Sequence, residues 1–178
     1  MHPSFQQTFE QIEQQRANLI KRLQTLPTEV YHRSPAQGQW SISQVMTHLI
    51  TAERLSLMYM KKKAQGIDQL PDAGLLASLR IMVLKVSQRF PLKFKAPKVV
   101  VENTPPAWSF EEMVTQWDTL RQELATFLNN IEERHVHRQV YKHPLAGRLD
   151  ARQAMIFFQE HIIHHQPQIN RLIPSAVK

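Results

Sequence analysis

Three histidines occupy positions where the core of a helical protein would normally hold aliphatic side chains. His48 interrupts the apolar helical stripe of residues 45–59, and His165 interrupts a similar stripe in residues 155–172. His161 precedes His165 by four residues, so on a helix their Cβ atoms lie about 5–6 Å apart on one face. This H-x-x-x-H spacing is typical of two ligands that share one metal ion.

Metal binding would resolve two costs of burying these side chains. An imidazole in an apolar core needs a partner for each nitrogen, and three protonated imidazoles would repel one another. The chain contains no cysteine, so only histidines and carboxylates could hold a metal. The residues therefore predict a divalent cation, such as zinc, nickel or iron, on His48, His161 and His165, with an open position for water or substrate.

His164 leaves an alternative to this ligand set open. It lies three residues after His161 and could replace His165, although the apolar stripe favours His165 because His164 is rotated toward the edge of that face. If His164 were a fourth ligand, the site would be closed and structural rather than catalytic. A histidine on an apolar face is also often an ordinary core residue with satisfied nitrogens.

The polar residues near these histidines offer no clear catalytic base. Glu53 lies five positions after His48, about 140° around the helix, and fits a solvated carboxylate. Glu160 is likewise off the ligand-bearing face. Gln44 shares the face of His48 and could contact substrate or a metal-bound water, but its more ordinary role is to cap the helix with Ser41. We therefore assign no catalytic residue.

Four long amphipathic segments must position these side chains. Each shows apolar residues at alternating steps of three and four, and three of them begin with a capping pattern. They span residues 5–26, 41–62, 110–134 and 150–172, with caps at Ser41/Gln44, Ser109/Glu112 and Asp150/Gln153. Residues 75–90 predict a further helix, followed by an irregular crossover, and residues 135–149 predict a loop. Pro167 predicts a kink near the end of the last helix.

This pattern predicts an all-α protein, namely a four-helix bundle with a long crossover carrying an extra helix between helices 2 and 3. With 178 residues and 42% apolar residues, we expect one domain that covers residues 1–178. The chain has only four glycines and no nucleotide-binding glycine motif. No signal peptide or spanning segment is recognisable, so we expect a cytoplasmic protein with no membrane partner.

The basic charge does not by itself indicate nucleic-acid binding. The formal net charge is +7, and much of the excess lies between Arg80 and Lys98, where no acidic residue occurs. This stretch could steer an anionic cosubstrate or form a solvated face. No helix-turn-helix or RNA-binding motif accompanies it, so we expect no nucleic-acid partner. His2, His32 and His143 are expected at the surface.

Two segments resemble the DinB/YfiT-like superfamily of four-helix-bundle proteins. They are residues 40–53, WSISQVMTHLITAE, and residues 161–171, HIIHHQPQINR, and the order of the helices is also similar. The resemblance implies a divalent metal, often nickel or zinc, on one histidine of the second helix and two of the last. These positions match His48, His161 and His165. It is also compatible with a homodimer formed through the faces of the bundle.

The resemblance suggests a reaction class without selecting a substrate. Characterised members include thiol S-transferases that use bacillithiol, mycothiol or glutathione, a thiol-dependent isomerase, and many proteins described only as metal-dependent hydrolases. We therefore expect a metal-dependent hydrolase or thiol S-transferase that acts on a small molecule with or without a low-molecular-weight thiol. The alternative is a non-catalytic bundle, binding a small molecule or forming a dimer, with a structural or vestigial metal site.

Overall fold

The computed structural model describes residues 1–88 and 106–174, and these residues are mostly helical. The α-helices are α1 Pro3–Leu23, α2 Thr28–His32, α3 Ile42–Ala64, α4 Leu75–Gln88, α6 Phe110–Asn129 and α7 Ala151–Leu172. Two 3₁₀ turns, Ile67–Gln69 and Glu133–His135, and two short strands, β1 Tyr141–His143 and β2 Gly147–Leu149, complete the described elements. The predicted all-α class is confirmed. In the described part of the chain, no helix has the length and apolarity needed to cross a membrane.

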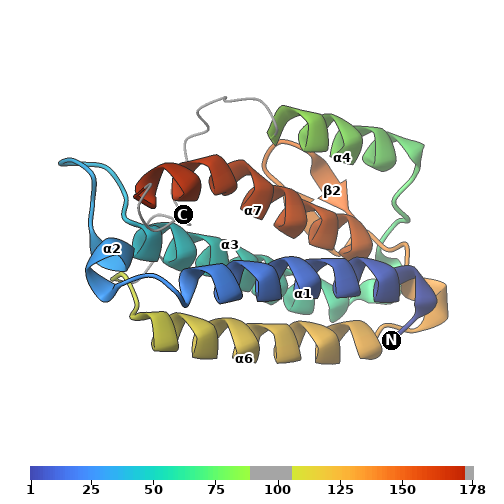
Figure 1. Cartoon of the computed structure of the whole chain (residues 1–178). Coiled ribbons are helices and arrows are strands. Elements are labelled where there is room, and N and C mark those ends of the chain that lie inside the picture. Colours follow the sequence, from blue (N-terminus) through green and yellow to red (C-terminus); the bar gives the residue numbers. More distant parts are fainter. Residues whose placement is uncertain (89–105, 175–178) are drawn as a thin grey trace.

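The four long helices α1, α3, α6 and α7 lie side by side (Figure 1). Helix α3 packs against both α6 and α7, and α1 also packs against both. Their apolar stripes meet in a common core, in which the largest fully buried side chains include Phe5, Ile12, Leu49, Met113, Trp117 and Phe158. Because α3 has neighbours on two sides, it buries two faces, one toward α7 and another toward α6.

Capping boxes begin the two helices that carry the candidate histidines. Ser41 Oγ accepts a hydrogen bond from the Gln44 backbone N–H at 3.2 Å, and Gln44 Oε1 accepts one from the Ser41 N–H at 2.8 Å. Asp150 and Gln153 form the same pair of bonds, at 2.7 and 3.1 Å. Two of the three predicted caps are therefore confirmed as complete boxes, and they fix where α3 and α7 start relative to their histidines.

Helix α6 differs from the prediction at both ends. Ser109 accepts a hydrogen bond from the Glu112 backbone N–H at 3.1 Å, but only this half of the predicted capping box is formed. The helix ends at Asn129, and the residues up to Arg134 that were predicted to continue it include a 3₁₀ turn. The backbone N–H of Asn130 is shared among several carbonyls of the last turn, which is a common way for a helix to end.

Two small elements were not predicted. Helix α2 occupies part of the polar stretch before Ser41, and a hairpin lies in residues 135–149, which were expected to be a loop. In the hairpin, Tyr141 pairs with Leu149 and His143 with Gly147 in antiparallel register. Gly147 has a φ of +72°, which glycine adopts without the steric cost that a side chain would add. Each strand has three residues, too few for an alternating pattern to be recognised.

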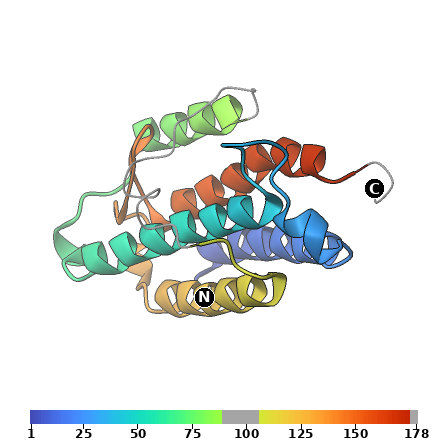
Figure 2. The ribbon, with the colours of Figure 1, turned by 90° about the vertical axis from the view of Figure 1, so that its left-hand side faces the viewer.

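Helix α4 lies outside the four long helices and packs against α7 and β2 (Figure 2). Its buried side chains are Ala77, Ile81 and Leu84. The helix was predicted over residues 75–90, and Leu75–Gln88 agrees closely. The crossover that follows, with most of the basic stretch ending at Lys98, lies outside the described residues. Helix α7 continues through Pro167 to Leu172.

Candidate metal centre

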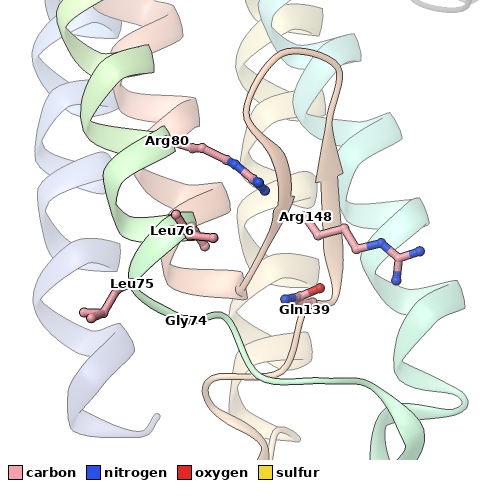
Figure 3. Close-up of a pocket in the computed structure, with 7 residues that line it drawn as sticks. Gly74, Leu75, Leu76, Arg80, Gln139 and Arg148 are labelled. Carbon is pink, nitrogen blue, oxygen red and sulfur yellow. The ribbon is translucent and has the colours of Figure 1, made fainter.

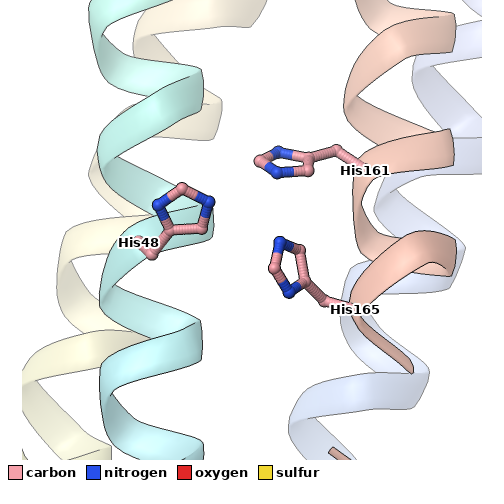
Figure 4. Close-up of side chains that lie close together, drawn as sticks. All are labelled: His48, His161 and His165. Carbon is pink, nitrogen blue, oxygen red and sulfur yellow. The ribbon is translucent and has the colours of Figure 1, made fainter. Parts of the chain in front are cut away.

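The three predicted histidines meet between α3 and α7. His48 comes from α3, and His161 and His165 come from successive turns of α7. One ring nitrogen of each lies within 4.8 Å of the other two. The ring centroid of His48 is 5.2 Å from each of the others, and the rings of His161 and His165 are 4.9 Å apart. Figure 4 shows the three rings turned toward one shared space.

All three imidazoles are neutral at ordinary pH. Burial and then the nearby His165 lower the pKa of His48 to about 4. Burial is also the main reason that the pKa of His165 falls to about 4, although its Nδ1 forms a 2.9 Å hydrogen bond with Gln168 Oε1 that opposes the shift. Burial, and then the neighbouring histidines led by His165 and His48, lower the pKa of His161 well below its usual value. Neutral imidazole is the form that binds a metal ion.

The chemistry of this donor set fits a divalent metal ion. His161 Nδ1 is fully buried and has no hydrogen-bond partner in the described part of the chain, which is costly for a polar atom. His48 is buried and His161 and His165 are partly buried, and coordination through the imidazoles would offset part of the cost of removing the three rings from water. Among the described residues, the group of possible metal ligands has three members. His164 is not one of them, although its ring lies 5.2 Å from that of His165.

Aromatic side chains hold two of the rings in place. The Trp40 ring lies 5.0 Å from the His48 ring, and Phe157 stacks on His161 at 5.3 Å with an angle of 16° between the planes. Phe157 is one helical turn before His161 on α7, so the same spacing that pairs the histidines also supplies this contact. These contacts fix the ring orientations before any ligand is bound.

Glu53 is buried, so its prediction as a solvated carboxylate is wrong. It forms an ion pair with Arg121 of α6, at 3.0 Å, and accepts a hydrogen bond from the indole N–H of Trp117 at 3.2 Å. Burial raises the pKa of Glu53, while Arg121 and Trp117 oppose this shift. The carboxylate links α3 to α6 and is not directed toward the histidines.

The other polar residues considered from the sequence are also engaged elsewhere. Glu160 is buried and lies 3.5 Å from Lys85 of α4. Gln44 is exposed, and its amide oxygen takes part in the capping box with Ser41. Contact of Gln44 with substrate stays a prediction. The absence of a general base stays a prediction.

His143 is buried, so its predicted surface position is wrong. Its Nδ1 accepts hydrogen bonds from the backbone N–H groups of Leu145 and Ala146, each at 3.1 Å. Its ring packs against Phe157, with the centroids 4.4 Å apart. Because Nδ1 accepts two bonds, the proton of the neutral ring resides on Nε2. Sequence patterns gave no signal for this residue because the hairpin that buries it was not predicted.

We expect His143 to make the protein less stable in acid. Burial lowers its pKa from 6.5 to about 4, so between these values the unfolded chain binds a proton that the folded chain does not. Stability is therefore lost as the pH falls through this window, by about 3 kcal/mol at most. Asparagine at this position can still accept the two backbone bonds but cannot titrate. The free energy of unfolding of metal-free His143→Asn, measured in urea, should fall less than that of the native protein.

The exposed His32 provides the control for this pH series. His32→Asn should follow the native protein at every pH, because the His32 side chain is exposed and its surroundings change little on unfolding. If the native protein and His143→Asn lost stability in parallel between pH 6.5 and 4, the expectation for His143 would be contradicted.

A cavity of about 380 Å³ lies between the start of α4 and the hairpin (Figure 3). Arg80 reaches from α4 toward the hairpin, and Arg148 extends from the hairpin away from α4. The cavity is lined by Gly74, Leu75, Leu76, Ala77, Arg80, Gln139 and Arg148. The three clustered histidines do not line it, so this cavity is a separate feature of the α4 side of the molecule.

One family model and one relative each match most of the chain. The family model described as the DinB superfamily matches residues 11–169. The uncharacterized protein YuaE of Bacillus subtilis strain 168 is 25% identical over 153 residues, covering 84% of this chain and 87% of that protein. No solved structure matches this chain significantly. The matched region includes His48, His161 and His165.

Proposed function

The chain belongs to the DinB superfamily, and from this premise we propose that it is a metal-dependent enzyme of the hydrolase or thiol S-transferase type. We propose that α1, α3, α6 and α7 form the four-helix bundle expected from the sequence, in a single domain. His48, His161 and His165 would bind a divalent cation, with nickel or zinc the best candidates.

The observation that carries this proposal is the convergence of three neutral imidazoles from two helices. Their ligand atoms lie within 4.8 Å of one another, although more than a hundred residues separate His48 from His161. Among the described residues this group has three members, whereas a structural zinc site normally has four protein ligands. Three ligands leave a position for water or substrate, as in catalytic sites.

A bound divalent cation would supply a water or thiol nucleophile at neutral pH by favouring its deprotonated form. The chain's own contribution is to keep the three imidazoles neutral and oriented. Trp40 and Phe157 provide apolar walls beside His48 and His161, which limit the access of bulk water to the rings. Glu53 forms an ion pair with Arg121, and we assign it no role in proton transfer.

A second candidate is a non-catalytic protein that keeps the metal for structure or has lost the activity. The proximity of His164 favours this alternative, because its ring lies 5.2 Å from that of His165. If His164 completed the coordination sphere, substrate would have no open position. Dimer formation is compatible with either function.

Activity measurements with and without a thiol separate these functions. The metal-free protein is loaded with nickel or zinc and assayed with activated esters and with small electrophiles, in the presence and absence of glutathione or bacillithiol. Metal-dependent turnover that requires the thiol would support S-transfer, and turnover without it would support hydrolysis. Stoichiometric metal with no turnover in either series would support the non-catalytic alternative. The metal-free protein is the control in each assay.

A further inference from the structure

Gln168 is in direct contact with one of the three clustered histidines. Its Oε1 lies 2.9 Å from His165 Nδ1, and the two residues are three positions apart on α7. An amide oxygen can only accept a hydrogen bond, so the ring nitrogen that faces it must be the donor. In the neutral ring, a proton on Nδ1 leaves Nε2 with a free lone pair.

From this geometry we propose that Gln168 is a positioning residue that selects the Nδ1–H form of His165 and so presents Nε2 to the metal ion. The inference rests on the proposed function, because it assumes that the histidine cluster binds a metal. Without Gln168, the neutral ring would divide between two forms, and the one with its proton on Nε2 cannot bind a metal through that atom.

Among the described residues, the other two rings have no comparable side-chain partner. In the part of the chain that the structure describes, His48 and His161 are held by ring contacts with Trp40 and Phe157. Ring contacts fix the orientation of an imidazole but not the nitrogen that carries its proton. His161 Nδ1 has no hydrogen-bond partner among the described residues. His165 is therefore the ring at which a side chain, Gln168, determines which nitrogen carries the proton.

Pro167 stiffens the turn that carries Gln168. The proline ring fixes one backbone angle immediately before Gln168, and α7 nevertheless continues to Leu172. A restricted backbone lowers the entropy lost when the amide is held against the imidazole. We therefore assign Pro167 and Gln168, but not the exposed Gln166, to the positioning of His165.

Nickel and zinc affinities of metal-free protein test this proposal. Gln168→Leu keeps a similar volume but removes the acceptor, and we expect it to weaken metal binding about 10–100-fold in a competition titration with a chelating dye. Gln168→Glu retains an acceptor for Nδ1–H and should restore binding to at least the native affinity. Gln166→Leu, in the exposed position just before Pro167, is the matched control and should not change the affinity.

The position of the proton on His165 gives a second readout that a merely structural role would not change. In ¹⁵N spectra of the metal-free protein, native His165 should show the Nδ1–H form, whereas Gln168→Leu should show a mixture of both forms. If native protein binds metal and Gln168→Leu binds it equally well with an unchanged His165 spectrum, the proposal for Gln168 is wrong. If native protein binds neither metal, the proposed function itself fails.

Discussion

Each of the single variants His48→Ala, His161→Ala and His165→Ala should bind nickel or zinc more than about 100-fold more weakly than the native protein. This exceeds the loss expected for Gln168→Leu, because a first ligand is removed rather than its hydrogen-bond partner. A site with three protein ligands needs all three of them. The two histidines that remain in each variant would not retain the metal through purification. Elemental analysis of the purified proteins and a competition titration of their metal-free forms would measure the loss.

Two other histidines serve as controls for this series. His32 is exposed and is not a member of the three-histidine group, so His32→Ala should retain one metal ion per chain. His164→Ala decides whether the site is open, because a fourth ligand would weaken binding strongly when removed, whereas a neighbour would not. Native protein without stoichiometric metal, or full metal content in His48→Ala, would contradict the proposed site.

The part of the candidate site that could be predicted is the part that helical periodicity determines. The four-residue spacing alone places His161 and His165 on one face, and the apolar stripe explains why that face is buried. Bringing His48 to the pair required α3 to pack on α7 with a particular rotation, which its position in the apolar stripe and the family resemblance both indicated. The structure brings the three residues together, while their binding of a metal stays a prediction.

The parts that could not be predicted depend on contacts between elements rather than on periodicity. The position of His143 depends on a hairpin with three-residue strands, whose register comes from backbone pairing and the turn at Gly147. The bond from His165 to Gln168 depends on side-chain conformations beside Pro167. Helix α4 was recognised, but its packing on α7 could not be read from its own sequence.

The prediction for Glu53 gave the correct face of the helix but the wrong surroundings for its carboxylate. The prediction that it faces away from His48 assumed that a helix has one buried face and one solvated face. Helix α3 has neighbours on two sides, so the face that turns away from α7 meets α6 instead. There Arg121 and Trp117 provide the partners that a buried carboxylate needs.

Removing Arg121 should strongly destabilise the protein. Arg121→Met is expected to lower the free energy of unfolding by about 3–5 kcal/mol, because it leaves the Glu53 carboxylate buried without its counter-charge. The same change also removes the 3.2 Å ion pair between Arg121 and Glu13. Urea denaturation of the metal-free protein near neutral pH would measure the loss independently of any metal.

The double variant Glu53→Gln with Arg121→Met separates lost charge compensation from lost packing. It removes both charges and should be more stable than Arg121→Met alone, because no unpaired carboxylate remains in the core. Lys61→Ala breaks the half-exposed ion pair with Glu123 and should change stability by only about 0–1 kcal/mol. A loss below about 1 kcal/mol in Arg121→Met would show that Glu53 does not depend on this partner.

The pH dependence provides an independent check on the same pair. Arg121 opposes the rise that burial causes in the pKa of Glu53, so without it the folded-state pKa should rise further. A folded-state pKa above the unfolded one favours folding in acid, and this contribution is lost as the pH rises. The deficit of Arg121→Met relative to the double variant should therefore shrink as the pH is lowered from about 8 to about 5. A deficit that does not change with pH would indicate lost packing in place of an uncompensated charge.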